Sequence, residues 1–421
     1  LWIFTRRAFG GGRKATAAAY LVAVAYALSW PIASALAFDF HEVAFAPVLT
    51  AVALERIQAG RLRTALLALA GLLLVKEDMG FLVAGIGVYL ILSRPRTLPK
   101  QWLVGAALVV AGVADSLIAT YVLIPAMGGR ADYYWAYQAL GNNGSQAIAH
   151  ILAHPASSLQ LAITPRVKLD TMLWLLAAFC FLSLRSPLVL ATIPLLAERM
   201  LATKFPNWWV TGFQYNAYLV IVLAMAAVDG TARLDRDWLR IRQRIAARRD
   251  PAEDAPAEDA PAEDAPAEDA PAARRAPARA GGTVALGCAV AMAAVAVALV
   301  PRFAFGPALH PSFYHRTRLM NAAAAADARV PNGVTVQAVG SLGPQLSSRD
   351  TVLLFDGDGE TPRFSPWIVA DVRRRVFTFH SVQAQRQRVA LLERHGYQVV
   401  FRRAGYVVLH RGGTGAGQAP R

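Results

Sequence analysis

The sequence predicts a mainly α-helical membrane protein: a polytopic transmembrane bundle of about nine helices, followed by a small C-terminal extracytoplasmic α/β lobe. Three observations predict this class. The chain is 55% hydrophobic and only 17% charged, whereas soluble domains have about 25% charged residues. Long apolar runs fill residues 16–230 and 283–300. Short runs rich in β-branched and aromatic residues follow residue 302, and these are typical of strands.

The basic residues indicate which partner the chain has. Its formal net charge is +15, and most of the basic residues are arginines. Many of them lie in short loops between apolar runs, as the positive-inside rule requires of cytoplasmic loops. The charge therefore favours the lipid bilayer as the partner, and nucleic-acid binding is not expected. The excess of arginine and alanine is typical of bacteria with GC-rich genomes, so we expect a multi-pass protein of the bacterial plasma membrane.

If the basic loops are cytoplasmic, the chain follows one consistent path. The crossings are expected at residues 16–37, 43–59, 64–75, 79–92, 102–124, 169–184, 187–202, 215–229 and 283–300. The predicted domains are a transmembrane domain (1–230), a cytoplasmic segment (231–282), a last transmembrane helix (283–301) and an extracytoplasmic lobe (302–421).

Residues 64–93 admit two interpretations. A single long helix would bury Lys76, Glu77 and Asp78 at its middle and reverse the sidedness of every later loop. A hairpin with a break at these charges agrees better with the positions of the basic loops. Its first arm of about twelve residues would be about 18 Å long, against about 30 Å of hydrocarbon. The three charges would then lie below the outer surface in a protein-lined or wet depression.

The segment after the eighth expected crossing changes composition twice. Residues 233–249 are strongly basic and predict a separate helix on the cytoplasmic surface. Four Pro-Ala-Glu-Asp-Ala units follow from Pro251 to Ala270. Proline at every fifth position opposes a helix, and the units offer no apolar surface for a core. They predict a disordered linker; the alternative is an electrostatic clasp on the flanking arginines.

The C-terminal segment has the pattern of a small α/β lobe. Helical stretches are expected near residues 313–328 and 383–395. Short strands are expected at residues 334–338, 351–355, 367–370, 397–401 and 406–409. The lobe contains no cysteine, so it has no disulfide despite its expected compartment.

Two clusters of ionisable residues interrupt the apolar region. Asp39, His41 and Glu42 lie where the first expected helix reaches the outer surface, and Lys76-Glu77-Asp78 ends the third. Charges near membrane depth are costly unless paired or hydrated, so they indicate a functional site. The first cluster suits a divalent cation or a general base. The alternative is a polar cap at the start of the next helix.

Aromatic and histidine pairs give weaker signals. Tyr134 with Trp135, and Trp208 with Trp209, suit stacking on a sugar, although aromatic belts at membrane surfaces are common. His150 and His154 share a helical face, but no acid follows them as in zinc proteases, so an interfacial amphipathic helix is the better interpretation.

Four motifs resemble a known family. They are Phe38-Asp39-Phe40-His41-Glu42, Leu74-Val75-Lys76-Glu77-Asp78, residues 193–199 (IPLLAER) and residues 213–217 (FQYNA). They resemble the bacterial membrane proteins of "domain of unknown function 2079", and residues 334–349 resemble the C-terminal lobe of that family. The resemblance covers most of the chain except the Pro-Ala-Glu-Asp-Ala insert.

The resemblance implies an architecture similar to that of GT-C glycosyltransferases, which take a sugar from a polyprenyl phosphate at the outer membrane face. In that superfamily an essential acid lies in the first outer loop. The chain begins at Leu1 with an apolar stretch and then Arg6 and Arg7, which we interpret as the tail of an earlier transmembrane segment. We therefore expect that an N-terminal region is missing.

The leading hypothesis is a GT-C-like glycosyltransferase with a polyprenyl-phosphate-linked sugar as partner. The expected catalytic residues are Asp39, Glu42, Glu77 and Asp78; the expected substrate-binding residues are Lys76, Tyr134, Trp135, Trp208 and Trp209; and His41 is the expected ligand of a divalent cation. The alternatives are a transporter, which predicts inverted repeats, and a non-catalytic scaffold with a partner-binding outer lobe.

Overall fold

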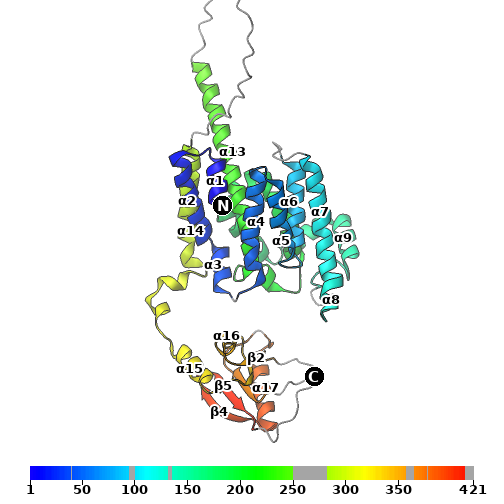
Figure 1. The fold of residues 1–421 in the computed structure, drawn as a ribbon, viewed down its shortest axis with the longest axis vertical. Helices are drawn as coiled ribbons and strands as arrows, with labels where there is room; N and C mark the ends of the chain where they lie inside the picture. Colours follow the sequence, from blue (N-terminus) through cyan, green and yellow to red (C-terminus); the bar gives the residue numbers. More distant parts are fainter. Residues whose placement is uncertain are drawn as a thin grey trace, which may run out of the picture. The chain divides into compact units, whose positions relative to one another are not determined.

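The computed structural model describes residues 1–38, 40–93, 100–130, 135–249, 282–356, 365–376 and 378–412. Two compact units divide the chain, Leu1–Leu309 and His310–Arg421, and each has its own hydrophobic core (Figure 1). The expected site residues Asp39 and Tyr134 lie outside the described residues, as does the repeat from Pro251 to Ala270.

The first unit is helical throughout. Its α-helices are α1 (Trp2–Ala8), α2 (Gly12–Leu28), α3 (Trp30–Ala37), α4 (Ala46–Gln58), α5 (Leu62–Leu73), α6 (Met79–Leu92), α7 (Gln101–Ile118), α8 (Ile124–Ala126), α9 (Gly144–Ala153), α10 (Pro155–Ile163), α11 (Arg166–Ala177), α12 (Ile193–Leu201), α13 (Ala217–Arg249) and α14 (Thr283–Leu299). A π-helical turn, η2 (Ala119–Leu123), joins α7 to α8.

Three helical stretches are long and apolar enough to cross a membrane: Gln101–Ala126, Gln214–Ile245 and Thr283–Arg302. The helices α2 and α3, bent by 45° relative to each other, make a fourth if they are one span. For the part of the chain that the structure describes, the expectation of about nine crossings is therefore too high. The remaining apolar runs are divided into shorter helices; α5 and α6, for example, have 12 and 14 residues.

One of these divisions occurs where two full crossings, 169–184 and 187–202, were expected. Helix α11 ends at Ala177, and Cys180 and Phe181 then adopt left-handed backbone with φ of 53° and 59°. Two short 3₁₀ helices follow, η3 (Leu182–Arg185) and η4 (Pro187–Thr192), before α12 begins. Non-helical backbone at membrane depth needs partners inside the protein. This part of the chain packs against α13 and α6 accordingly.

Helix α13 is the central element of the unit, and it runs without a break for 33 residues. A crossing was expected at 215–229, and these residues lie within the candidate span Gln214–Ile245. A surface helix was expected over the basic residues 233–249, but these residues continue α13 without a break. Arg233 and Asp229, one turn apart, form an ion pair of 2.7 Å that supports continuation of the helix. Gly230 lets the backbone of Leu182 approach closer than any side chain would allow. The apolar half of α13 therefore forms much of the core.

Helices α6 and α7 are held together by glycine. A Cβ atom on Gly105 would lie 2.6 Å from the carbonyl oxygen of Gly87, and Gly80 and Gly112 approach each other more closely still. Small residues at such contacts let helix backbones pack tightly in a membrane, where no hydrophobic effect drives association. The charges at 76–78 lie between α5 and α6, so the alternative of one continuous helix over 64–93 is wrong.

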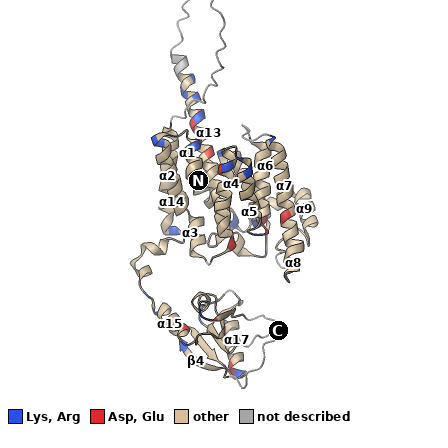
Figure 2. Cartoon of the chain, viewed as in Figure 1, with Lys and Arg blue, Asp and Glu red and all other residues tan. Residues whose placement is uncertain are grey.

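Loops that were expected on the same side of the membrane meet at one end of the unit. Arg7 pairs with Glu55 at 2.8 Å, and Arg185 pairs with Asp237 at 2.9 Å. Lys14 donates a hydrogen bond of 3.0 Å to Thr283 at the start of α14. Figure 2 shows lysine and arginine gathered at this end, around the starts of α2 and α7. We call this end, where Arg7, Lys14 and Arg185 lie, the basic end of the helical unit.

The second unit is a five-stranded sheet with two flanking helices of more than one turn, α15 (Arg318–Asp327) and α17 (Val382–Arg394). The strands are β1 (Thr335–Ala338), β2 (Thr351–Leu354), β3 (Trp367–Asp371), β4 (Gln398–Arg403) and β5 (Tyr406–His410), in the order β2-β1-β3-β5-β4. Strand β1 is parallel to β2 and β3, whereas β5 is antiparallel to β3 and β4. The five strands fall where they were expected, so a C-terminal α/β region is confirmed.

Candidate functional site

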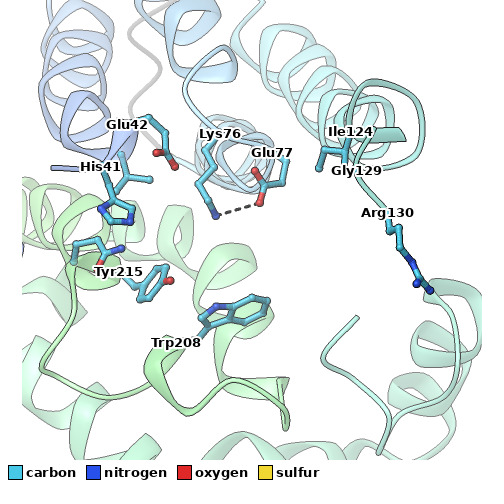
Figure 3. A pocket seen from close by; sticks show the side chains of 11 residues that line it. His41, Glu42, Lys76, Glu77, Ile124, Gly129, Arg130, Trp208 and Tyr215 are labelled. Atoms are coloured by element: carbon cyan, nitrogen blue, oxygen red, sulfur yellow. Dashed lines mark ion pairs between the residues drawn. The ribbon is translucent and has the colours of Figure 1, made fainter. Parts of the chain in front are cut away.

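A cavity of about 580 Å³ lies beside the end of α3 and beside α8, away from the starts of α2 and α7 (Figure 1); Figure 3 shows the side chains that line it. Four segments that are far apart in the sequence supply its lining. The lining residues are His41, Glu42, Val43, Lys76, Glu77, Ile124, Gly129, Arg130, Trp208, Gln214 and Tyr215. Both expected charge clusters therefore line one cavity. In the other two segments, Trp208 is the one lining residue that was expected at the site.

The first segment connects α3 to α4. The ring of Phe38 packs on His41, with 5.2 Å between centroids, and on Phe213, with 5.3 Å. These contacts fix the connection against the segment that precedes α13. Glu42 begins a 3₁₀ turn, η1 (Glu42–Phe45), and its exposed side chain points into the cavity (Figure 3). Glu42 also lies in the first turn of η1, which agrees with the alternative that it is a polar cap at the start of a helix.

The second segment is the break between α5 and α6. Lys76 Nζ lies 2.9 Å from Asp78 Oδ2 and 3.2 Å from Glu77 Oε1. The Asp78 carboxylate is buried behind the wall, whereas Glu77 faces the cavity. One ammonium group faces two carboxylates, so these three residues carry a net negative charge. The cavity wall thus offers a cation and an acid side by side.

The third and fourth segments add apolar, guanidinium, amide and aromatic groups. Helix α8 supplies Ile124, and Gly129 and Arg130 follow it. The connection between α12 and α13 supplies Trp208 and Tyr215. Asn207 donates a hydrogen bond of 3.3 Å to the Tyr215 hydroxyl, which links the two aromatic positions.

Two expected substrate-binding residues lie elsewhere. Trp209 is 4% exposed, and its ring packs on the ammonium group of Lys168, 4.6 Å from the ring centroid. Trp135 donates its indole N–H to the Gly141 carbonyl at 2.9 Å and packs on Tyr137. Neither residue is among those that line the cavity, and the adjacent Trp208 and Trp209 point in different directions.

Several residues beside the cavity carried no expected role. Arg199 and Glu198, on α12, lie behind the aromatic segment, and Glu198 interacts electrostatically with Asp78 and Lys76. Buried oxygens of Asp78, Glu198, Gln214 and Tyr218 have no hydrogen-bond partner within the described chain. Such groups in a native protein call for an explanation. In the sequence, Glu198, Arg199 and Gln214 were marked only by the resemblance of residues 193–199 and 213–217 to family motifs.

A metal site is not complete in this part of the molecule. Among the residues the structure describes, no group of three or more His, Cys, Asp or Glu side chains is placed to hold a metal ion. His41 and Glu42 would supply two ligands for a divalent cation, and their neighbour Asp39 lies outside the described ranges.

The long apolar helices and the charged cavity at one bundle end define an integral membrane protein with a polar site. Residues 1–248 match the model of the DUF2079 family, described as "Predicted membrane protein", and the chain belongs to this family. No curated protein and no solved structure matches the chain.

The matched region contains all four motifs that carried the resemblance. Three of them line the cavity, through His41 and Glu42, through Lys76 and Glu77, and through Gln214 and Tyr215. The fourth, at 193–199, holds the aromatic segment in place through Arg199. The motifs that carried the resemblance are thus gathered around one site.

Proposed function

We propose that this protein is a GT-C-like glycosyltransferase, which transfers a sugar from a polyprenyl phosphate to an acceptor hydroxyl. The observation that supports this best is the combination of groups in one cavity: carboxylates, a cation and aromatic rings. Glu42 and Glu77 supply the carboxylates, Lys76 the cation, and Trp208 and Tyr215 the rings. A lipid-linked sugar phosphate needs all three kinds of contact.

The reaction requires one base and one stabilised leaving group. The acceptor oxygen attacks the anomeric carbon while the bond from that carbon to the phosphate oxygen breaks. The acceptor proton passes to a carboxylate, and the polyprenyl phosphate leaves with the bonding electrons. Glu42 is the better base, because Glu77 is already paired with Lys76 at 3.2 Å. Lys76 and Arg130, which both line the cavity, would interact with the phosphate as its negative charge grows.

The surroundings of the cavity suit a lipid-linked donor. Ile118, Val122 and Leu123, on the helix that leads to the cavity, are 51%, 57% and 49% exposed. These residues lie in a candidate membrane span, so lipid covers their apolar surface. An isoprenoid chain lying along this surface would bring its phosphate to Ile124, the first residue of this helix on the cavity wall.

The orientation is part of the proposal. The basic end of the bundle would face the cytoplasm of a bacterial cell, as the positive-inside rule requires. The cavity would then open at the outer face of the plasma membrane, where polyprenyl-linked sugars are used. The unit after Leu309 would be extracytoplasmic and would hold the acceptor.

The test uses the full chain reconstituted in lipid, with undecaprenyl-phosphate glucose carrying a labelled sugar and cell-envelope material as acceptor. Glu42→Gln should reduce transfer by at least about a hundredfold, the usual scale for loss of a general base. Donor binding, measured by thermal shift with unlabelled undecaprenyl-phosphate glucose in the absence of acceptor, should remain. Asp170→Asn, a change at an exposed acid of α11, is the matched control and should keep full activity. Transfer that is unaffected by Glu42→Gln would contradict the proposed mechanism.

A further inference from the structure

The connection between α12 and α13, residues 202–216, is the part of the site with the least regular structure. It has only two single 3₁₀ turns, η5 (Pro206–Trp208) and η6 (Gln214–Asn216). Its backbone carbonyls therefore lack the partners that a helix would provide. At membrane depth, every such group must be satisfied inside the protein. The connection nevertheless carries the aromatic wall of the cavity, Trp208 and Tyr215.

Arg199 supplies the missing donors for this wall. It is 2% exposed, and its guanidinium donates hydrogen bonds to three residues of the connection. Nε lies 2.7 Å from the Trp208 carbonyl oxygen, and Nη2 also donates to this oxygen. Nη1 lies 2.7 Å from the Tyr215 carbonyl oxygen, and Nη2 lies 3.0 Å from Asn216 Oδ1. One side chain thus joins both aromatic positions through their backbone.

Other buried donors hold the same connection at different points. Lys168 donates to the carbonyl of Ala202 at 2.9 Å, and it also binds the carbonyl of Met200, in the last turn of α12, at 2.6 Å. Thr171 donates to the Trp209 carbonyl at 2.7 Å. These bonds fix the rest of the connection, whereas the two carbonyls bound by Arg199 belong to cavity-lining residues. Arg199 is therefore the donor with a direct effect on the shape of the cavity.

We infer that Arg199 is a positioning residue, which builds the aromatic wall of Trp208 and Tyr215 before any ligand binds. The planar guanidinium fork reaches two carbonyls seven residues apart and an amide oxygen at once, and a lysine ammonium cannot reproduce that geometry. A preformed wall reduces the conformational entropy lost when a sugar stacks on it. The identification of the ligand as a sugar rests on the proposed function. The preformed wall is inferred from the hydrogen bonds of Arg199 alone.

Mobility of the connection tests the inference without any activity measurement. A spin label is attached to a cysteine at Gly212, where an added Cβ meets no heavy atom within 4 Å, in a chain lacking Cys180 and Cys288. In the full chain in lipid, Arg199→Lys and Arg199→Gln should both make the label more mobile. Arg166→Gln, at a side chain that is 88% exposed, is the control and should not. Unchanged label mobility in both Arg199 variants would overturn the inference.

Ligand binding separates positioning from a general structural role. Arg199→Lys should raise the KM for undecaprenyl-phosphate glucose roughly tenfold with little change in kcat, since it weakens binding rather than chemistry. Saturating donor should restore order to the label. A loss of kcat at unchanged KM, or a label that stays mobile with bound donor, would contradict a positioning role.

Two further outcomes remain interpretable. If wild-type protein neither binds nor transfers the sugar, the proposed function fails, while the label experiment still decides whether Arg199 orders the wall. If both Arg199 variants fail to fold, Asn216→Ala replaces them, because it removes one acceptor of Arg199 and leaves the guanidinium in place. A label that is as ordered in Asn216→Ala as in the wild type would then overturn the inference.

Discussion

Lys76 and Asp78 form an ion pair of 2.9 Å in which the Asp78 carboxylate is 8% exposed, at the break between two apolar helices. Taking two charges out of water is costly, and the cost is recovered only while both partners are present. The pair explains how the chain tolerates ionisable residues here, and it holds the ammonium group at the cavity wall beside Glu77.

The first prediction concerns this pair. Asp78→Asn should lower the free energy of unfolding by about 3 kcal/mol, because it leaves a partly buried lysine with a single acid. Lys76→Met should cost at least as much, since two carboxylates lose their partner. The double variant should recover part of the loss, and thermal unfolding in lipid nanodiscs measures all three. Arg166→Gln, in an exposed pair of 3.7 Å, should change stability by no more than about 0.5 kcal/mol. Strict additivity of the two single changes would show that the pair is not coupled.

The second prediction concerns the contact of α6 with α7. Gly105→Ala should destabilise the bundle by about 1–3 kcal/mol, because the new methyl group would lie 2.6 Å from the Gly87 carbonyl oxygen. Gly287→Ala is the matched control, since a Cβ at this position in α14 meets nothing within 4 Å. It should leave the melting temperature unchanged or slightly raised. Equal effects of the two substitutions on the melting temperature would mean that the close approach is not needed.

The third prediction concerns sidedness. Single cysteines at Ser145 and Gln345, in a chain lacking Cys180 and Cys288, should react with a membrane-impermeant thiol reagent in intact cells. A cysteine at Ala257 should react only after the cells are opened, because the basic segments beside it are expected in the cytoplasm. Labelling of Ala257 together with protection of Ser145 and Gln345 would reverse the orientation and move the cavity to the cytoplasmic side.

The fourth prediction concerns pH and the C-terminal unit. Burial raises the pKa of Asp327 to about 6 from an ordinary 3.8, against the opposing effect of Arg349. The folded unit therefore binds this proton more tightly than the unfolded chain does. The contribution of Asp327 to the free energy of unfolding should therefore be largest below a pH of about 4 and should be lost as the pH rises through about 6.

Hydrogen exchange of the sheet peptides in the full chain, corrected for the intrinsic effect of pH, measures this dependence. Asp327→Asn removes the titrating group and should flatten the profile. Because Asp327 is partly exposed, the effect should be modest. A profile that is the same in the variant and the wild type would assign the pH dependence to other groups.

The C-terminal strands could be predicted closely because the signal for them is local. Val334–Ala338 and Tyr406–Leu409, for example, are short runs of strand-forming residues bounded by turn residues. Their order in the sheet could not be predicted in this way. That β5 pairs with β3 as well as with its neighbour β4 depends on contacts between residues far apart in the sequence.

The helical unit was harder to predict for a related reason. Apolar length indicates that a segment is buried, but it does not indicate where a helix ends. The end of α11 near Cys180 and the continuation of α13 past Asp229 depend on neighbours such as Leu182 and Arg233. Hydropathy alone therefore predicted too many crossings and placed a break in the longest helix.

The sequence by itself determined that this is a membrane protein with ionisable groups near His41 and Lys76, because charges stand out within apolar runs whatever their partners are. Only the tertiary structure decided that these groups share a cavity with Trp208 and Tyr215, and that Trp209 does not. The direction of an aromatic ring in an irregular connection depends on which distant donors bind its backbone. Arg199 donates to the Trp208 and Tyr215 carbonyls and Thr171 donates to the Trp209 carbonyl, and hydrogen bonds over such separations leave no periodic pattern in the sequence.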